Sequence, residues 1–296
     1  MSFGAMPSFL IHAFQADAVN TYLAPEPPKP QFSFFNWLQT CCVEKPVGDQ
    51  DYRLRQKEEV VIGHLQQEVA TTFQATSKEH EALLYSYFKE AIPAVTGSDH
   101  QTVPAGRRDK RWKLLGFQDE DPRTDFRGGG LLSLKCLIWM MRMDGPRVAS
   151  LIHESTGQGK LGPEQWYPFA AAVINVCFEM SNWLMLDQRR DGGKVPPEEL
   201  CTGFEYRKFA ELMAHEPETF FLLASSAVVA MHQEWCSKKY SVLEFRKCIR
   251  VALKRVASFL SLAGKEPVEK VLDDLRQTWE LPAASRSPTL EDLLRI

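Results

Sequence analysis

Apolar residues recur every three or four positions along most of the chain beyond residue 50, a spacing that places them on one face of an α-helix. The pattern predicts amphipathic helices over residues 53–74 and 77–91, the second ended by Pro93. An almost wholly apolar helix is expected over 131–143, with Gly145-Pro146 turning the chain after it. Five further helices are expected over residues 164–186, 200–215, 217–237, 241–262 and 266–279. Because no alternating strand pattern and no internal repeat are present, we predict an all-α bundle of roughly eight or nine helices.

Proline and glycine positions divide the chain into four predicted parts. Prolines such as Pro27 and Pro28 cannot continue a helix, so they make a stiff linker near the N-terminus. The four parts are an irregular N-terminal segment with this linker (1–50), helices that pack on the main domain (51–105), a helical domain (106–280) and a mobile C-terminal tail (281–296).

Composition narrows the class of protein. A hydrophobic share of 44% is ample for a core, and a net charge of −3 gives no overall field that would attract nucleic acid. Seven cysteines, an odd number without a CxxC pair, suit reduced thiols in the cytoplasm. No apolar run reaches the roughly 20 residues of a membrane-spanning helix. We therefore expect a soluble cytoplasmic protein that does not bind nucleic acid.

The segment from Phe32 to Cys42 allows two interpretations. Its aromatic residues, followed by Cys41 and Cys42, could form a peripheral membrane contact with two palmitoylated thiols. Alternatively, the aromatic side chains cover an apolar groove on the main domain. The sequence leaves both interpretations open.

Turn residues, aromatic residues and arginines are concentrated between residues 111 and 134. Gly116 and Pro122 interrupt regular structure, and Thr124 and Asp125 have side-chain oxygens that can cap a helix. Three successive glycines follow Arg127. The pattern predicts a loop that presents Arg127 at the start of a helix.

This stretch resembles the signature of the ELMO domain family. The shared residues are Trp112, Gly116-Phe117-Gln118, Asp121-Pro122, Thr124-Asp125-Phe126-Arg127-Gly128 and Gly130-Leu131-Leu132. Later residues occur in the family's order, namely Tyr167-Pro168-Phe169, Val173-Ile174-Asn175, Trp235 and Phe245. The resemblance extends over residues 107–262.

The resemblance implies a function that involves small GTPases. Small single-domain members of the family are GTPase-activating proteins for Arf and Arf-like GTPases, whereas larger members are scaffolds in a Rac-activating exchange complex. A chain of 296 residues has no room for the additional modules of the larger members, which favours GTPase activation. The alternative is a non-catalytic helical adaptor that binds a small GTPase or an exchange factor.

Arg127 is the candidate catalytic residue. A GTPase is accelerated when a partner inserts a planar, permanently charged guanidinium beside the γ-phosphate, where negative charge develops. The resemblance implies this role for Arg127 as well. The alternative is a structural role, in which Arg127 bonds neighbouring carbonyl groups and holds the loop.

Other residues of the stretch are candidates for partner contact: Arg123, Gln118, Asp125 and Arg111. Gln118 could orient water or pin the loop by its amide, and Asp125 could cap the helix or anchor an arginine. The aromatic residues Trp112, Phe117 and Phe126 are expected in the core.

We expect no cofactor and no metal in this chain. Residues 157–161 lack the spacing of a phosphate-binding loop, and His232 with Cys236 has no second pair of ligands. GTP and Mg²⁺ would be carried by the partner, an Arf-family small GTPase. Neither stand-alone catalysis nor a small-molecule substrate is expected.

Overall fold

The structure is a computed structural model of the chain. It describes residues 54–98, 102, 104, 108–156, 165–187, 200–238, 240–264 and 266–278. The predictions for residues 1–50, for the segment Phe32 to Cys42 and for the tail at 281–296 lie outside the described residues.

The described part of the chain is helical and contains no strand, which confirms the predicted all-α class. Its nine α-helices are α3 (Gln56–Ala70), α4 (Lys78–Thr96), α5 (Arg111–Leu114), α6 (Phe126–Ser155), α7 (Phe169–Trp183), α8 (Gly203–His215), α9 (Thr219–Lys238), α10 (Phe245–Ala263) and α11 (Val268–Thr278). Two short 3-10 helices are η1 (Pro122–Thr124) and η3 (Val242–Glu244). None of the described helices combines the length and the apolar content needed to cross a bilayer.

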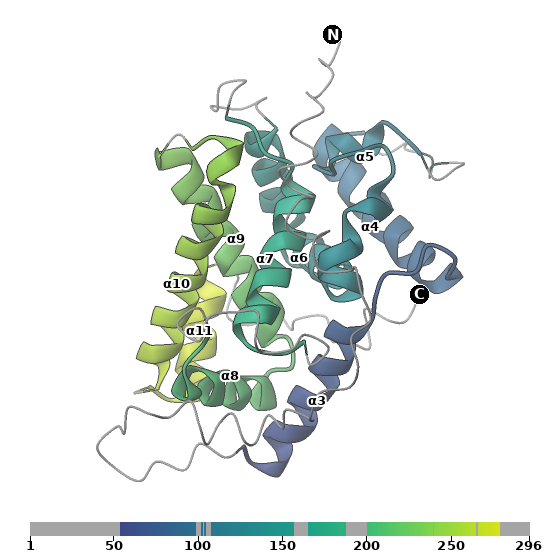
Figure 1. The fold of residues 1–296 in the computed structure, drawn as a ribbon. Coiled ribbons are helices and arrows are strands. Elements are labelled where there is room, and N and C mark those ends of the chain that lie inside the picture. Colours follow the sequence, from purple (N-terminus) through teal and green to yellow (C-terminus); the bar gives the residue numbers. More distant parts are fainter. Residues whose placement is uncertain are drawn as a thin grey trace, which may run out of the picture.

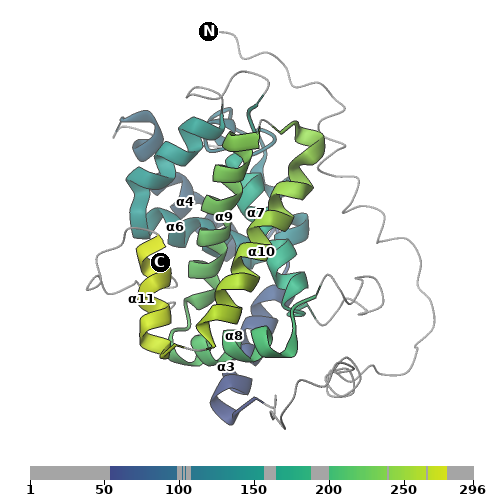
Figure 2. The same ribbon diagram turned by 90° about the vertical axis from the view of Figure 1, so that its left-hand side faces the viewer.

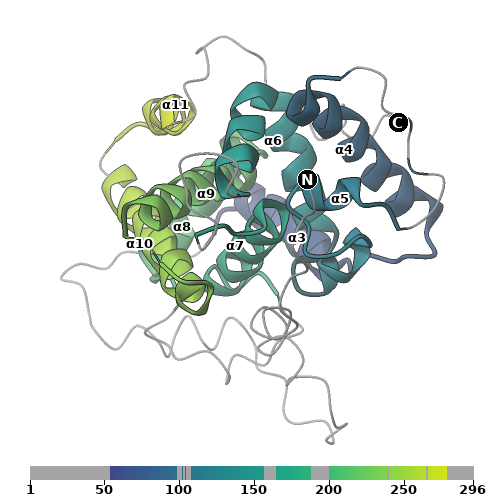
Figure 3. The ribbon, with the colours of Figure 1, turned by 90° about the horizontal axis from the view of Figure 1, so that it is seen from above.

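Helix α6 lies at the centre of the bundle. Helices α10, α9, α7, α6 and α4 stand side by side, and α8 lies across the lower end of α10 and α9 (Figure 1). Helix α6 packs against α3, α4, α7 and α9. Seen from above, α7 covers one side of the bundle and α11 lies outside α9 (Figure 3).

Two charged residues of α6 form ion pairs with α3 and α4. Lys135 is almost fully buried in the apolar half of α6, and its ammonium group lies 2.5 Å from the carboxylate of Glu68 in α3. Arg142 binds Glu90 of α4 at 2.9 Å. A buried charge is costly unless it is paired, so these contacts favour one placement of α3 and α4 on the core.

Two predicted chain breaks differ from the structure. Helix α4 does not end before Pro93 but continues to Thr96, because a proline in the last turn removes only one hydrogen bond. Gly97 closes the helix through its N–H, which donates to the carbonyl of Pro93 at 2.8 Å. The expected turn at Gly145-Pro146 is a break at Asp144 (φ −154°, ψ 75°), after which the helix resumes.

The resumed helix, which reaches Ser155, was not predicted. Asp144 provides its N-cap, because Oδ1 accepts the backbone N–H of Arg147 at 3.0 Å. Pro146 lies in the first turn, where its missing N–H costs no hydrogen bond.

Gly130 separates the first turn of α6 from the remainder. Its φ of 57° and ψ of −155° are not helical. The N–H of Leu131 donates to the carbonyl oxygen of Thr71 at 3.1 Å, and a Cβ on Gly130 would lie 2.7 Å from that same oxygen. Glycine is therefore required at the point where the first turn of α6 meets the segment that follows α3.

Gly130→Ala should lower stability by about 1 to 3 kcal/mol, because it combines a positive φ with a steric clash. Thermal unfolding of the purified variant measures the effect. Gly63→Ala in α3 is the matched control, since a Cβ there meets no atom within 4 Å. It should leave stability unchanged or raise it by about 0.5 to 1 kcal/mol, because alanine favours a helix interior. Equal melting temperatures for Gly130→Ala and the native protein would contradict the close contact.

Candidate functional site

The loop between α5 and α6 is anchored by buried aromatic rings. Trp112, Phe117 and Phe126 are 1%, 1% and 2% exposed, as the sequence predicted. The ring centroids of Trp112 and Phe117 are 5.4 Å apart, and those of Phe117 and Phe126 are 5.9 Å apart. Phe73, from the segment after α3, stacks on Phe126 at 5.0 Å. The inner side of the loop is therefore part of the core, which restricts its motion.

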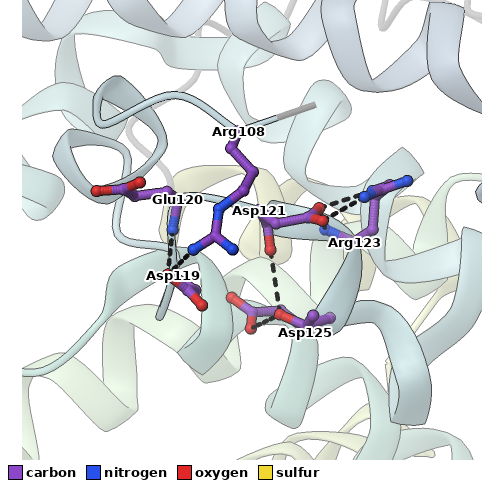
Figure 4. Close-up of polar contacts among 7 residues, drawn as sticks. Arg108, Asp119, Glu120, Asp121, Arg123 and Asp125 are labelled. Carbon is purple, nitrogen blue, oxygen red and sulfur yellow. Dashed lines mark hydrogen bonds and ion pairs between the residues drawn. The ribbon is translucent and has the colours of Figure 1, made fainter. Parts of the chain in front are cut away.

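Arg123 is held by an aspartate two residues before it. Asp121 Oδ1 accepts the backbone N–H of Arg123 at 3.2 Å and its Nε–H at 2.7 Å, and the second carboxylate oxygen binds Nη2 (Figure 4). The guanidinium holds the pKa of Asp121 below its usual value. Arg123 thus belongs to the internal scaffold of the loop, and its contact with a partner stays a prediction.

Arg111 has the same arrangement. Asp109 Oδ1 accepts its backbone N–H at 2.8 Å and its Nε–H at 2.9 Å, and Nη1 donates to the carbonyl of Thr102 at 2.7 Å. The guanidinium also lies 4.9 Å from the ring centroid of Phe88. Its partner contact, too, stays a prediction without support from the geometry.

Asp125 occupies the N-cap position of α6 but makes no capping hydrogen bond, so the predicted cap is wrong. Its carboxylate instead accepts the backbone N–H of Gln118 at 2.9 Å and ties the two ends of the loop together. The hydroxyl of Thr124 does not cap α6 either, since it donates to the carbonyl of Asp121 at 3.1 Å. The hydrogen bond that holds the loop therefore comes from the main-chain N–H of Gln118 and not from its side-chain amide.

Burial raises the pKa of Asp125 to about 7. The hydrogen bond from Gln118 and the positive charge of Arg127 favour the ionised form and oppose this effect. The loop thus contains a carboxyl group that ionises close to neutral pH.

Arg127 differs from the other arginines of the loop. Its side chain is exposed, and it makes no hydrogen bond or ion pair with any described residue. Its positive charge interacts with the carboxylate of Asp125 without a direct ion pair. The guanidinium is therefore accessible on this part of the surface, in contrast to those of Arg111 and Arg123.

The backbone that carries Arg127 is fixed from behind by α7. A Cβ on Gly129 would lie 3.0 Å from the carbonyl oxygen of Ile174 and 2.4 Å from Ser133 Oγ. A Cβ on Gly128 would touch the ring of Phe178 at 3.4 Å. The first turn of α6 therefore lies directly against α7, and a Cβ at residue 129 would crowd Ile174 and displace the side chain of Ser133.

The arginine run before the loop is described only in part. Arg107 lies outside the described residues. Arg108 is exposed, and its guanidinium lies 3.7 Å from Asp119 (Figure 4). Exposed pairs of this kind contribute little to stability, so Arg108 remains accessible to a partner.

The sequence did not predict that Thr71, Phe73, Ile174 and Phe178 support the loop from elsewhere in the chain. No local pattern identifies them, because their role depends on tertiary contact. Asp109 and Asp121 each lie two positions before the arginine they bind, but this spacing alone is no sufficient signal, because Asp125 lies two positions before Arg127 and forms no ion pair with it.

The pair His232 and Cys236 belongs to a polar network in the core. His232 Nδ1 is hydrogen-bonded to the hydroxyl of Tyr167 at 2.7 Å, and Nε2 lies 3.2 Å from Glu154. Within the described ranges no three His, Cys, Asp or Glu side chains are grouped to hold a metal ion.

A sequence model of the ELMO/CED-12 family matches residues 63–249. Because this match covers more than half of the chain, the protein belongs to the ELMO/CED-12 family. The matched region begins within α3 and includes α4, both of which precede the domain predicted at 106–280.

Three relatives illustrate the similarity. ELMO domain-containing protein B of Dictyostelium discoideum is 35% identical over 98 residues, which are 33% of this chain and 30% of the relative. ELMO domain-containing protein 1 of Bos taurus is 28% identical over 117 residues, which are 36% of this chain and 34% of the relative. The Homo sapiens protein of the same name is 31% identical over 83 residues, which are 28% of this chain and 23% of the relative. The chain thus covers about a third or less of each relative, and no solved structure matches it significantly.

Asp125→Asn should change the pH dependence of stability. The raised pKa of Asp125 stabilises the folded protein at low pH, and this contribution is lost as the pH rises from about 4 to about 7. Asparagine keeps an acceptor for the N–H of Gln118 but cannot ionise. The melting temperature of the variant, relative to the native protein, should therefore be a few degrees higher at pH 8 than at pH 5.

Asp121→Asn is the matched control. The pKa of Asp121 is lowered, so its ion pair with Arg123 is formed throughout the range from pH 5 to pH 8. The loss of stability in this variant should be the same at both pH values. If the difference in melting temperature between Asp125→Asn and the native protein were also the same at pH 5 and pH 8, the raised pKa of Asp125 would be contradicted.

Proposed function

We propose that the protein is a GTPase-activating protein for an Arf-family small GTPase and supplies Arg127 in trans. Membership of the ELMO/CED-12 family supports a role with small GTPases in general. The observation that carries the finer proposal is the exposed guanidinium of Arg127 on a tightly held turn, without a hydrogen bond to any described residue.

The chemistry of GTP hydrolysis explains why such an arginine would act. In the transition state, negative charge grows on the oxygens around the γ-phosphoryl group. A guanidinium beside them adds a permanent positive charge and a fork of N–H donors that fits two oxygens at once. GTP and Mg²⁺ are held by the partner, so this chain needs neither a nucleotide site nor a metal site of its own.

The surroundings of Arg127 suit insertion into a partner. The backbone is fixed by Gly129 against α7 and by Gly130 against Thr71, so little backbone freedom is lost on binding. Gly128, which follows Arg127 on the surface, has no side chain that would keep a partner at a distance. The side chain can therefore extend while its base stays in place.

A purely structural role for Arg127 has no support from its contacts within the described residues. The loop is held by buried rings, by the aspartate pairs and by the bond from Gln118 to Asp125. Arg127→Ala should therefore melt within a few degrees of the native protein. If the protein is a non-catalytic adaptor, it should bind a GTPase without stimulating GTP hydrolysis, and Arg127→Ala should leave that binding unchanged.

Single-turnover hydrolysis of GTP by purified Arf-like GTPases should be stimulated by the native protein. Arg127→Lys should reduce this stimulation by about 10³-fold or more, because lysine keeps the charge but loses the planar fork. The amount of folded protein is verified by thermal unfolding of each variant.

Arg108→Lys is the matched control, since it makes the same replacement at a second exposed arginine near the loop. It should alter the half-saturating concentration of the activator at most and leave the maximal rate unchanged. Equal stimulation by the native protein and by Arg127→Lys would remove Arg127 from catalysis and favour the adaptor.

A further inference from the structure

Helix α10 carries an unusually one-sided charge. Between Phe245 and Ala263 there are five basic residues and no acidic one, although the whole chain has a net charge of −3. The basic residues are all exposed: Arg246, Lys247, Arg250, Lys254 and Arg255. We call this set the α10 basic face. The opposite face of the helix is buried, with Ile249, Ala252, Val256 and Leu260 in the core.

The α10 basic face lies on the outside of the bundle. Helix α10 packs on α8 and α9, and in Figure 2 it stands in front of α9. Leu243, in η3 just before α10, is 77% exposed. The described surface has one other large, exposed hydrophobic residue, which is Val60 in α3. An exposed apolar side chain thus adjoins the start of the basic face.

Intramolecular ion pairs do not engage the whole basic face, because Lys254 makes none with a described residue. Arg246 lies 3.9 Å from Glu179 of α7, and Lys247 lies 3.0 Å from Glu244. Arg255 donates to a neutral side chain, Gln233, at 2.9 Å. Ion pairs this exposed are weak and are screened by salt, so they yield readily to a stronger anionic partner.

We propose that the α10 basic face binds an anionic lipid surface. A row of basic residues along one helix matches the diffuse negative potential of a membrane that contains acidic phospholipids. Leu243 at one end would enter the headgroup region to a shallow depth. This contact differs from one through the segment Phe32 to Cys42, and it does not depend on the proposed GTPase activation.

An acidic protein fits the α10 basic face less well. Stable protein interfaces depend on aromatic or large apolar anchors near the centre of the contact. The exposed positions of α10 hold no aromatic anchor between Arg246 and Arg255, and Leu243 lies at the edge. Lipid binding driven by charge requires no such anchor.

One end of the basic face and the turn that carries Arg127 both border α7. Arg246 reaches Glu179, while the neighbouring Phe178 borders Gly128, which follows Arg127. Helices α10 and α7 are visible side by side in Figure 1. A lipid surface along α10 would therefore lie near the turn that carries Arg127, with α7 between them.

Cosedimentation of the full chain with vesicles tests the proposal. The native protein should bind vesicles of phosphatidylcholine with phosphatidylserine, bind pure phosphatidylcholine weakly, and dissociate as the salt concentration rises. Combined Lys247→Gln, Arg250→Gln and Lys254→Gln should weaken binding to the anionic vesicles on the order of a hundredfold. Leu243→Ser should weaken it to a smaller extent.

Matched variants separate the basic face from overall charge. Lys57→Gln, Lys78→Gln and Lys89→Gln together remove the same charge from exposed sites on α3 and α4, and Val60→Ser removes the other exposed hydrophobic residue. Both should bind vesicles like the native protein, and thermal unfolding should show that all variants are folded. Stimulation of a GTPase in solution without vesicles should be unchanged by the triple substitution in α10, so the two proposals fail independently.

Three outcomes would overturn the lipid contact. The first is equal binding of the native protein to vesicles with and without phosphatidylserine. The second is an equal loss of vesicle binding in the triple variant of α10 and in the triple variant of α3 and α4. The third is unchanged vesicle binding by the triple variant of α10. If the last were accompanied by weaker binding to a GTPase in solution, the α10 basic face would instead be a protein interface.

Discussion

The close approach of the first turn of α6 to α7 and to Thr71 is the constraint on which the surface around Arg127 depends. Gly129 and Gly130 allow backbone atoms of three segments to meet where any side chain would intrude. Buried rings of Trp112, Phe117 and Phe126 hold the preceding loop in the same core. A backbone fixed on both sides can present a long side chain outward at little entropic cost, which is what binding in trans requires.

The arginines of the loop divide into two groups by their partners. Arg111 and Arg123 are engaged by aspartates two residues earlier, and they stabilise the loop itself. Arg127 follows a carboxyl group that is already occupied by the N–H of Gln118, and its guanidinium extends to the surface. Arg111 and Arg123 thus stabilise the loop, whereas Arg127 is accessible, because only the first two have a carboxylate that binds the guanidinium.

The sequence predicted most of the fold because the apolar spacing of helices is a local property. It failed where a local rule was overridden, as at Pro93, which the last turn of α4 tolerates, and after Asp144, which caps a further helix. The signature around Arg127 located the site, but the support from Thr71, Ile174 and Phe178 could not be predicted, since those contacts form only in the folded chain. The hydrogen bond from the N–H of Gln118 to Asp125 could not be predicted either. An aspartate that caps a helix and one that accepts a hydrogen bond from the preceding loop have the same local sequence.

The affinity of the protein for an Arf-like GTPase in its GDP–aluminium fluoride form tests the central claim most directly, because that form mimics the charge of the transition state. We expect the native protein to bind this form much more tightly than the GDP form or a GTP-analogue form. Arg127→Lys should lose this preference while it keeps any weaker binding to the other two forms. Equal affinity of the native protein for all three forms, or an undiminished preference in Arg127→Lys, would contradict the account.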